Sequence, residues 1–435
     1  MTALRSGPAI SRRALLKGGA VVGAMLGGGL LPGFVRRALA AADKGPGRRK
    51  VLAFLFLRGA MDGLNVVSPH GEPRFAELRP TLALPAPGGE RKSDAGPGAL
   101  LDLGVPGFGL HPSLEPLLPL WREGTLAFVH AVGSPDATRS HFDAQDFLEL
   151  GTPGVKGTRD GWMARAVAQA PGDRSALEAI AVAQRLPRSL QGDPAALAFA
   201  SLDQLRLRPM AGTPGGEQGR TLARQTFEAL YDLAPDGPVA ASGKEALAAV
   251  ELLERKLAGR TFRPGEGGYP AAPVGQSLRL LAALIQSDVG LRVGFAEVGG
   301  WDTHVQQQGV LARNLADLGK ALAAFHADLG ARLEDVVLVA ATEFGRTARQ
   351  NGTLGTDHGH GSVAFVLGGA VAGGKLHGRW PGLSDHQLFE GRDLAVTTDL
   401  RAVLAAAARA QLGATDVPAL FPGYSGPVLP GLVRV

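Results

Sequence analysis

The chain has 435 residues, of which 45% are hydrophobic and 20% charged, so it can bury a full core as one large domain or two, which excludes a disordered protein. Its formal net charge of +5 depends on residues 1–40, which contain six basic residues and no acidic one; the rest has 39 basic and 40 acidic residues, a net charge of −1. A basic surface for nucleic acid is therefore not supported. Because the chain has no cysteine, any metal ion must be held by Asp, Glu, His or hydroxyl groups.

The first 40 residues have the pattern of a cleaved export signal. Arg12 and Arg13 precede a short apolar run rich in Gly and Ala (18–34), and a cleavage site of the A-x-A type ends at Ala40. An uncleaved membrane anchor is the alternative, but the run is short and Gly-rich, and no other segment reaches the length of a membrane span. The pattern resembles a twin-arginine signal. That resemblance implies the twin-arginine translocase as a partner, export of the folded protein to the periplasm or beyond, and no stable membrane span after cleavage.

The first strand is expected at residues 50–57, an almost unbroken apolar run typical of a strand buried on both faces of a parallel sheet. Asp62 follows it, at the sheet edge where ligands bind in open α/β folds; taken alone, Asp62 fits a helix cap or turn equally well. After a segment rich in Pro, Gly and charge (80–109), a helical segment (112–124) and a second apolar strand (125–133) complete a β–α–β pattern.

Arg139 and Ser140 lie in a loop that enters a helix after the second strand. A hydroxyl at a helix start, with free backbone N–H groups and an arginine beside it, suits the binding of an anion. Alternatively, Ser140 is an ordinary N-cap, with Asp143 completing a box-like arrangement three residues later. Both interpretations can hold at once.

Residues 161–290 give weaker signals and are interpreted as a helical cap inserted into the sheet domain. Helical periodicity is present in four stretches: 161–170, 219–234, 243–260 and 274–288. Strands are expected at 176–184 and 197–207, and no long-period repeat indicates a solenoid.

The sheet resumes at 291–298, which leads into Asp302 and His304. An amphipathic helix is expected over 305–333, where leucines and a phenylalanine recur at three- and four-residue spacing.

A further strand at 336–342 ends at Glu343, and another is expected at 362–367. The glycine-rich loop between them contains three potential ligands: Asp357, His358 and His360. Either histidine alone would be interpreted as a surface residue. As a pair beside Asp357, at the same sheet edge as Glu343, they are predicted to bind metal.

The four apolar runs 50–57, 125–133, 291–298 and 336–342 are predicted to be adjacent strands of one mainly parallel sheet. Their carboxyl ends would bring four residues to one edge: Asp62, Ser140, Asp302 and Glu343. Carboxylates and imidazoles gathered at strand ends are what a hydrolytic metal centre requires.

Five motifs closely resemble the DUF1501 family of bacterial proteins over residues 50–410. They are Met-Asp-Gly-Leu-Asn (61–65), Arg-Ser-His-Phe-Asp-Ala-Gln-Asp (139–146), Gly-Gly-Trp-Asp-Thr-His (299–304), Glu-Phe-Gly-Arg-Thr (343–347) and Thr-Asp-His-Gly-His-Gly (356–361). That family is more distantly similar to the alkaline phosphatase and sulfatase superfamily, which implies an α/β three-layer sandwich with a mainly parallel sheet and helices on both faces.

Carried over by position, the superfamily resemblance implies a role for several residues. Asp62 would match the first metal-binding aspartate and Ser140 the nucleophile. The pair Asp302 and His304 would share one metal, at a shorter spacing than usual, and Glu343 would stand where an aspartate–histidine dipeptide supplies ligands. The last ligand histidine would be His358 or His360. Two departures make metal binding better supported than catalysis: Phe344 replaces a ligand histidine, and Ser140 lacks the residues that surround known nucleophiles.

The implied reaction is displacement at phosphorus or sulfur in a small anionic ester, with Arg139 neutralising the substrate's anionic oxygens. The rival hypothesis is an exported metal-binding or scaffold protein without turnover. A serine hydrolase using Ser140 and a histidine is a third, but it leaves the gathered carboxylates unexplained.

One divalent metal ion is expected to bind tightly, and zinc is favoured because Asp302, His304 and a histidine at 358 or 360 combine imidazole with carboxylate. A second site built from Asp62, Glu343 and Ser140 would offer only oxygen donors, which suit magnesium, calcium or manganese and hold them less tightly.

Overall fold

The computed structural model describes residues 48–90, 98–204, 216–233 and 238–434. The expected leader, with Arg12, Arg13 and the cleavage site at Ala40, lies outside these residues. A nine-stranded sheet forms the centre of the described chain. Its strands, in spatial order, are β11 (Leu376–His377), β5 (Leu126–Gly133), β10 (Ser362–Leu367), β9 (Val336–Ala341), β1 (Val51–Leu57), β8 (Val293–Val298), β6 (Ala179–Val182) and β7 (Leu197–Ala198), with β12 (Thr398–Asp399) also paired to β5.

The sheet is mainly parallel, as predicted. The apolar strand β1 lies between β8 and β9 and pairs in parallel with both. Strand β5 belongs to the same sheet, but the prediction that it adjoins these three is wrong, because β10 lies between β9 and β5 and is antiparallel to both. No helix forms between β9 and β10 among the described residues, and a parallel neighbour would need such a crossover. The two antiparallel steps leave β5 in the same direction as β1.

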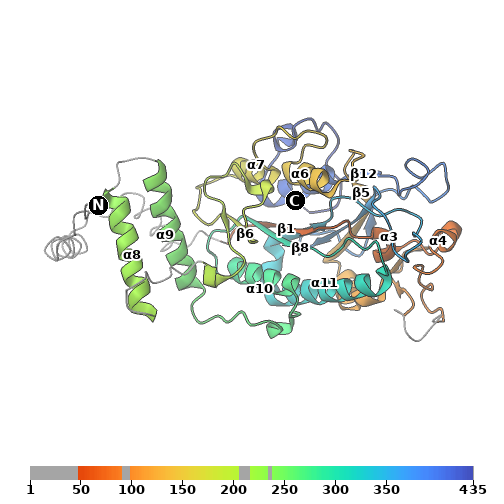
Figure 1. The fold of residues 1–435 in the computed structure, drawn as a ribbon, viewed down its shortest axis with the longest axis horizontal. Coiled ribbons are helices and arrows are strands. Elements are labelled where there is room, and N and C mark those ends of the chain that lie inside the picture. The colour runs from red at the N-terminus through yellow and green to blue at the C-terminus, as the bar shows by residue number, and fades with distance from the viewer. Residues whose placement is uncertain (1–47, 91–97, 205–215, 234–237, 435) are drawn as a thin grey trace, which may run out of the picture. The chain divides into compact units, whose positions relative to one another are not determined.

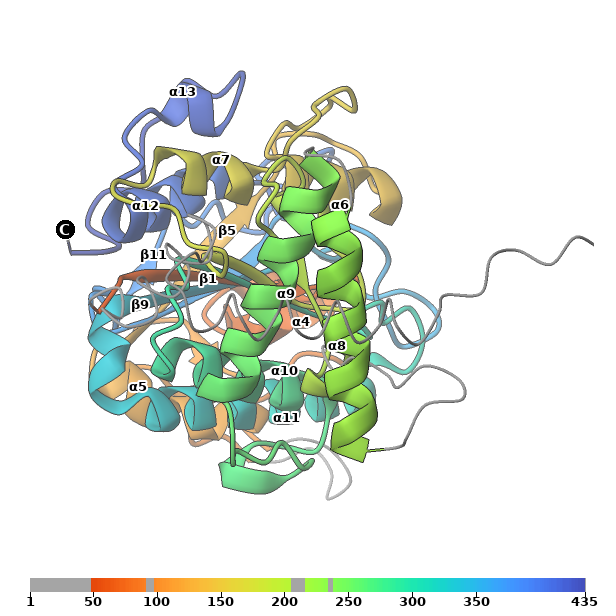
Figure 2. The ribbon, with the colours of Figure 1, turned by 90° about the vertical axis from the view of Figure 1, so that its left-hand side faces the viewer.

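Helices cover both faces of the sheet, which completes the predicted three-layer α/β fold (Figures 1 and 2). Alternate side chains of β1 serve the two faces, since successive residues of a strand point to opposite sides. Val51, Ala53, Leu55 and Leu57 join the core with α10 (Pro273–Gln286), α11 (Gln307–Leu329), η1 (Pro112–Leu117) and α5 (Leu118–Arg122). Leu52, Phe54 and Phe56 join the core with α7 (Trp162–Gln169), α12 (Leu400–Leu412) and α13 (Val417–Leu420).

The segment predicted as a helical cap contributes to the body of the fold. Its strands β6 and β7 extend the central sheet, and α7 and α10 pack on opposite faces. Helix α9 (Pro238–Lys256), which packs on α8 (Gly216–Leu233), supplies Ala249 and Leu253 to the first core, and Leu257 directly follows it. The short elements η2 (Arg188–Leu190), η3 (Leu202–Gln204) and η4 (Glu266–Gly268) complete this segment.

The other elements are short, apart from α6 (His141–Leu150), which follows β5. The remaining short elements are α3 (Gly63–Val66), α4 (Pro73–Leu78), η5 (Gly330–Asp335) and a small sheet of β2 (Val67–Ser68), β4 (Gly109–Leu110) and β3 (Leu101–Asp102). No helix in the described ranges has the length and hydrophobicity needed to cross a membrane.

The carboxyl ends of β1, β5, β8 and β9 meet at one edge of the sheet. The backbone N–H of Gly59, after β1, donates to Glu343 Oε1 at 2.9 Å, and that of Met61 donates to Thr342 Oγ1 at 3.0 Å. Because β10 is antiparallel, its amino end lies at this same edge and carries the loop with His358 to it. The topology therefore gathers the segments on which the predicted ligands lie.

Candidate metal centre

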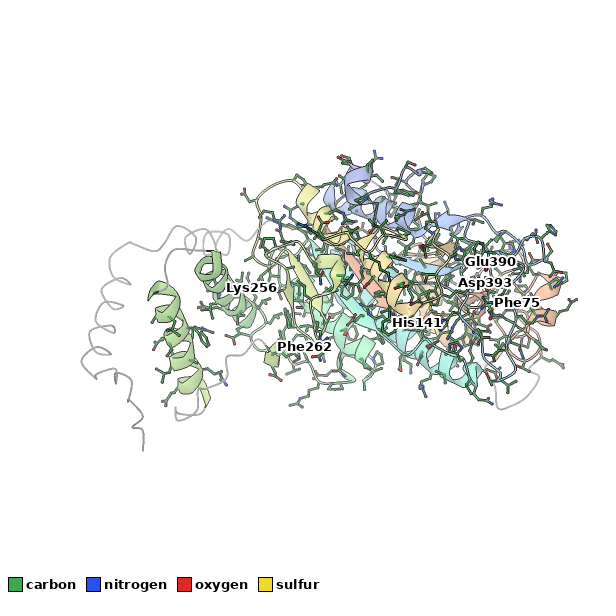
Figure 3. All side chains as sticks on the ribbon, turned by 45° about the horizontal axis from the view of Figure 1, so that its top comes forward. Phe75, His141, Lys256, Phe262, Glu390 and Asp393 are labelled. Carbon is green, nitrogen blue, oxygen red and sulfur yellow. The ribbon has the colours of Figure 1, made fainter. Side chains whose placement is uncertain are left out.

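His141 is the first residue of α6, placed there by Ser140, whose side chain caps the helix and accepts a hydrogen bond from the backbone N–H of Asp143 at 3.5 Å. The imidazole of His141 turns toward the sheet edge, where its Nδ1 lies 2.8 Å from Glu343 Oε1. Its Nε2 is buried without a hydrogen-bond partner and lies 3.5 Å from Asp302 Oδ1. The helix start thus fixes an imidazole between two carboxylates (His141 is labelled in Figure 3).

His358 and His304 approach the same carboxylate from two loops. His358 Nδ1 lies 2.8 Å from the backbone carbonyl of Arg139, and His304 Nδ1 lies 3.0 Å from Asp357 Oδ1. Carbonyl and carboxylate oxygens accept hydrogen bonds but cannot donate them, so the ring proton of each histidine belongs on Nδ1. The same argument holds for His141 beside Glu343. In their neutral form, all three imidazoles therefore present the lone pair of Nε2.

The three Nε2 atoms lie close to one carboxylate oxygen, Asp302 Oδ1. Asp302 Oδ1 lies 3.0 Å from Nε2 of His304 and 3.2 Å from Nε2 of His358, and these two nitrogens are 2.9 Å apart. The ligand atoms of His141, Asp302 and His358 all lie within 4.8 Å of one another. Zinc with bonds of about 2.0–2.1 Å separates tetrahedral ligands by about 3.3 Å. The donor types and their spacing therefore fit a divalent transition metal ion.

Asp302 is the charged member of this group. Burial alone would raise its pKa, but the positive charge of Arg346, and that of His304, His141 and His358 when these rings are protonated, lowers it. Arg346 is buried and donates from Nη2 to the same Oδ1 at 2.7 Å. Asp302 is thus held as a carboxylate with the oxygen that faces the imidazoles fixed in place.

Glu343 is buried and orients His141. Its Oε1 accepts hydrogen bonds from His141, Gln145 and Gly59, and its Oε2 accepts one from Thr342 Oγ1 at 2.8 Å. Burial would raise its pKa, but the hydrogen bonds outweigh burial and lower it. A carboxylate behind a ligand histidine fixes the tautomer and raises the basicity of the ring. Glu343 therefore does not contact the Nε2 atoms themselves but orients His141, whose Nε2 faces Asp302.

Asp357 has the corresponding place behind His304. Its Oδ1 accepts from Asn351 Nδ2 at 3.1 Å and faces His304 Nδ1. The hydrogen bond from Asn351 is the main cause of its lowered pKa.

Asp62 follows β1 at the predicted edge, but its side chain binds Arg79 and Gln307. Its two carboxylate oxygens form a buried, forked ion pair with Arg79, and Gln307 Nε2 also donates to it. Asp62 occupies the N-cap position of α3 without a side-chain capping bond. The structure therefore gives Asp62 neither the metal partners nor the capping bond expected of it.

His360 and Arg139 form contacts on a different side of the loop. The ring of His360 is buried and stacks on Phe389 with centroids 4.3 Å apart. The guanidinium of Arg139 binds Asp393 Oδ2 at 2.6 Å and Glu390 Oε2 at 2.7 Å; Figure 3 labels both acids. Its carbonyl, not its side chain, reaches the candidate centre, by accepting from His358. The predicted anion-binding role of Arg139 would require these ion pairs to break.

His141 is the residue that the sequence argument missed. It lies inside the motif 139–146, directly after Ser140, whose hydroxyl was predicted to be an anion site and nucleophile. A signal was available: like Asp302 and Glu343, His141 lies in the segment that follows an apolar strand, eight residues after the end of β5. Phe344, expected at a ligand position, stacks on the ring of His141 at 4.9 Å between centroids.

Two solved structures are similar to this chain at low identity. One is the PsFucS1 sulfatase from Pseudoalteromonas sp., 10% identical, with 93% of this chain and 78% of that chain covered and a TM-score of 0.37. The other is the PH0037 protein from Pyrococcus horikoshii, 12% identical, with coverages of 74% and 88% and a TM-score of 0.29. Scores this low carry no argument about activity, and no curated protein matches the chain.

Residues 127–420 match the family described as "Protein of unknown function (DUF1501)", and this range is more than half of the sequence. The chain belongs to the DUF1501 family.

Proposed function

We propose that this protein is an exported metal-dependent hydrolase of phosphate or sulfate esters that binds one divalent metal ion. The observation that carries the metal site is the convergence of imidazole lone pairs from His141 and His358 on Asp302 Oδ1, with His304 beside them. When the rings are neutral, these four electron-pair donors repel one another, and a divalent ion bound among them would replace this repulsion with attraction. Zinc suits three imidazoles and a carboxylate best.

A bound divalent ion supplies Lewis-acid chemistry and lowers the pKa of water at neutral pH. The side chains of Asp302 and His304 are 46% and 38% exposed, so an ester can reach the centre from solvent. The ester class and the exported location rest on the likeness of the motifs to phosphatases and sulfatases and on the leader pattern. A second metal site is not part of the proposal, because Asp62 and Glu343 already bind donors.

A non-catalytic metal-binding protein is the second candidate, and a specific observation favours it. Ser140 caps α6 and Arg139 is bound by two carboxylates, so neither predicted catalytic side chain is free to act on a substrate.

The metal site is tested by elemental analysis after exhaustive dialysis. The native protein should retain about one transition metal ion per chain, since the donors form one set. His141→Ala and His358→Ala should each lower retention at least tenfold. His360→Ala is the matched control from the same loop and should retain the metal. Equal retention in all three variants would show that the ligands are assigned wrongly.

Turnover separates the two candidates. The metal-loaded protein is assayed against aryl phosphates and aryl sulfates, with His358→Ala as the metal-free comparison. Hydrolysis that is lost in His358→Ala supports the hydrolase, whereas a retained metal ion without turnover of either ester supports the binding protein.

A further inference from the structure

Large apolar side chains with unusual exposure flank the candidate metal ligands. Phe142, the residue after His141, is 86% exposed, and Val305, the residue after His304, is 59% exposed. Val155 and Leu354 are 52% and 39% exposed. Isolated apolar side chains on a surface need no explanation, but a group of them around one site marks a binding surface.

Backbone and side-chain contacts attach these four residues to the two sides of the centre. On the α6 side, Lys156 forms an ion pair with Asp143, which brings the loop containing Val155 to the helix start that carries Phe142. On the other side, the backbone N–H of Gln307 donates to the carbonyl of Leu354 at 2.9 Å, so Leu354 lies by the turn that contains Val305.

A histidine from each side lies close to the same oxygen atom. Asp302 Oδ1 lies 3.5 Å from Nε2 of His141 and 3.0 Å from Nε2 of His304. In the sequence, Phe142 directly follows one of the two histidines beside this oxygen, and Val305 directly follows the other. A group bound at this oxygen therefore has an exposed apolar residue next to each histidine. Anionic oxygens at the metal would leave the organic part of an ester directed toward this apolar rim.

We propose that Phe142 and Val305 bind the organic group of the ester, so that the preferred substrates are anionic esters of apolar aryl or alkyl alcohols. This inference rests on the proposed function and adds the substrate class. An aromatic side chain provides a flat surface that packs against an aryl group and loses little conformational entropy. A sugar or polyol would leave this apolar surface in water and gain less from it.

Two phosphonates that are not hydrolysed separate the head group from the organic group. Phenylphosphonate and methylphosphonate are titrated into the zinc-loaded protein by calorimetry. The native protein should bind phenylphosphonate about tenfold more tightly, as expected for one added aromatic contact. The double variant Phe142→Ser and Val305→Ser should reduce this ratio to about twofold or less. Leu230→Ser, a change at a residue of α8 that is 57% exposed, is the matched control and should leave the ratio unchanged.

Each outcome bears on a different claim. An unchanged ratio in the double variant, or equal binding of the two phosphonates by the native protein, overturns the apolar substrate class and leaves the proposed hydrolase intact. Failure of the native protein to bind either phosphonate overturns the proposed function, and the inference with it. Because the substitutions are at exposed positions, folding should persist, and circular dichroism checks this.

Discussion

At the scale of single residues, the role of a histidine in this protein depends on the partners of its ring. His358 and His360 are separated by one glycine, yet one ring donates to the carbonyl of Arg139 and the other stacks on Phe389. Their sequence neighbourhoods are nearly the same, so the motif offered both as ligands. In the structure the two rings have different partners, and only His358 lies beside Asp302.

Another histidine, His130, should make the protein sensitive to acid. Its ring packs against Phe108 and Trp380, with both ring centroids 5.0 Å away, and burial lowers its pKa to about 3. The unfolded chain binds a proton near pH 6.5, so between pH 6.5 and 3 it holds more protons than the folded protein. The free energy of unfolding should therefore fall as pH drops through this window, by up to about 1.4 kcal/mol per pH unit for this residue. Above pH 6.5 the effect should vanish.

Urea unfolding at several pH values checks this dependence. His130→Phe, which keeps an aromatic ring in the site, should have a shallower decline below pH 6.5 than the native protein. His386→Phe changes an exposed histidine and should keep the native slope. Parallel declines in the native protein and His130→Phe would contradict the assignment.

At the scale of elements, glycines allow the loop before β10 to lie directly on the backbone of its neighbours. A Cβ on Gly359 would lie 2.3 Å from the carbonyl carbon of Arg346, and one on Gly355 would lie 2.2 Å from the carbonyl oxygen of His304. The obstructing atoms are backbone atoms, which cannot turn aside as a flexible side chain can. This close approach brings His358 within reach of Asp302.

Gly359→Ala should therefore displace His358 and lower metal retention. The added methyl group should also destabilise the fold by about 1–3 kcal/mol, as overpacking does. Gly352→Ala lies in the same loop with nothing within 4 Å of the new Cβ and should retain the metal. Metal analysis and thermal unfolding of the two variants measure both effects, and equal metal content in the two would contradict the packing argument.

At the scale of the whole molecule, the charge of the chain divides into a basic leader and a nearly neutral remainder. The six basic residues of the first 40 account for the positive net charge, because the rest sums to −1. The high isoelectric point of the whole chain is therefore no sign that residues 41–435 bind nucleic acid.

Export provides the test at this scale. Replacing Arg12 and Arg13 by Lys keeps the charge of the leader but removes the paired guanidinium groups that resemble the twin-arginine signal. Full-length precursor should then accumulate in the cytoplasm, as fractionation and immunoblotting would show. Replacing Arg36 and Arg37 by Lys, further along the leader, is the control and should leave export unchanged. Normal export of the first variant would rule out the twin-arginine assignment.

The sequence by itself determined the main strands and the edge of the sheet at which the candidate site lies. Runs such as 50–57 and 336–342 are apolar at nearly every position, and only burial on both faces of a sheet accommodates that. Their direction could also be predicted, since helices separate most of them. The antiparallel insertion of β10 could not, because its composition is that of any buried strand.

Only the tertiary structure decided which polar groups converge. The contact of His141 with Glu343 spans 202 residues of sequence, and that of His358 with Arg139 spans 219. These contacts fix the ring tautomers and turn the Nε2 atoms toward Asp302, while Arg79, 17 residues away, engages Asp62. Local hydrophobicity places a strand end to within a few residues, but the direction of a side chain at that end depends on partners brought by other strands. The sequence could therefore place the candidate site at this edge, whereas the identity of its candidate ligands had to come from the fold.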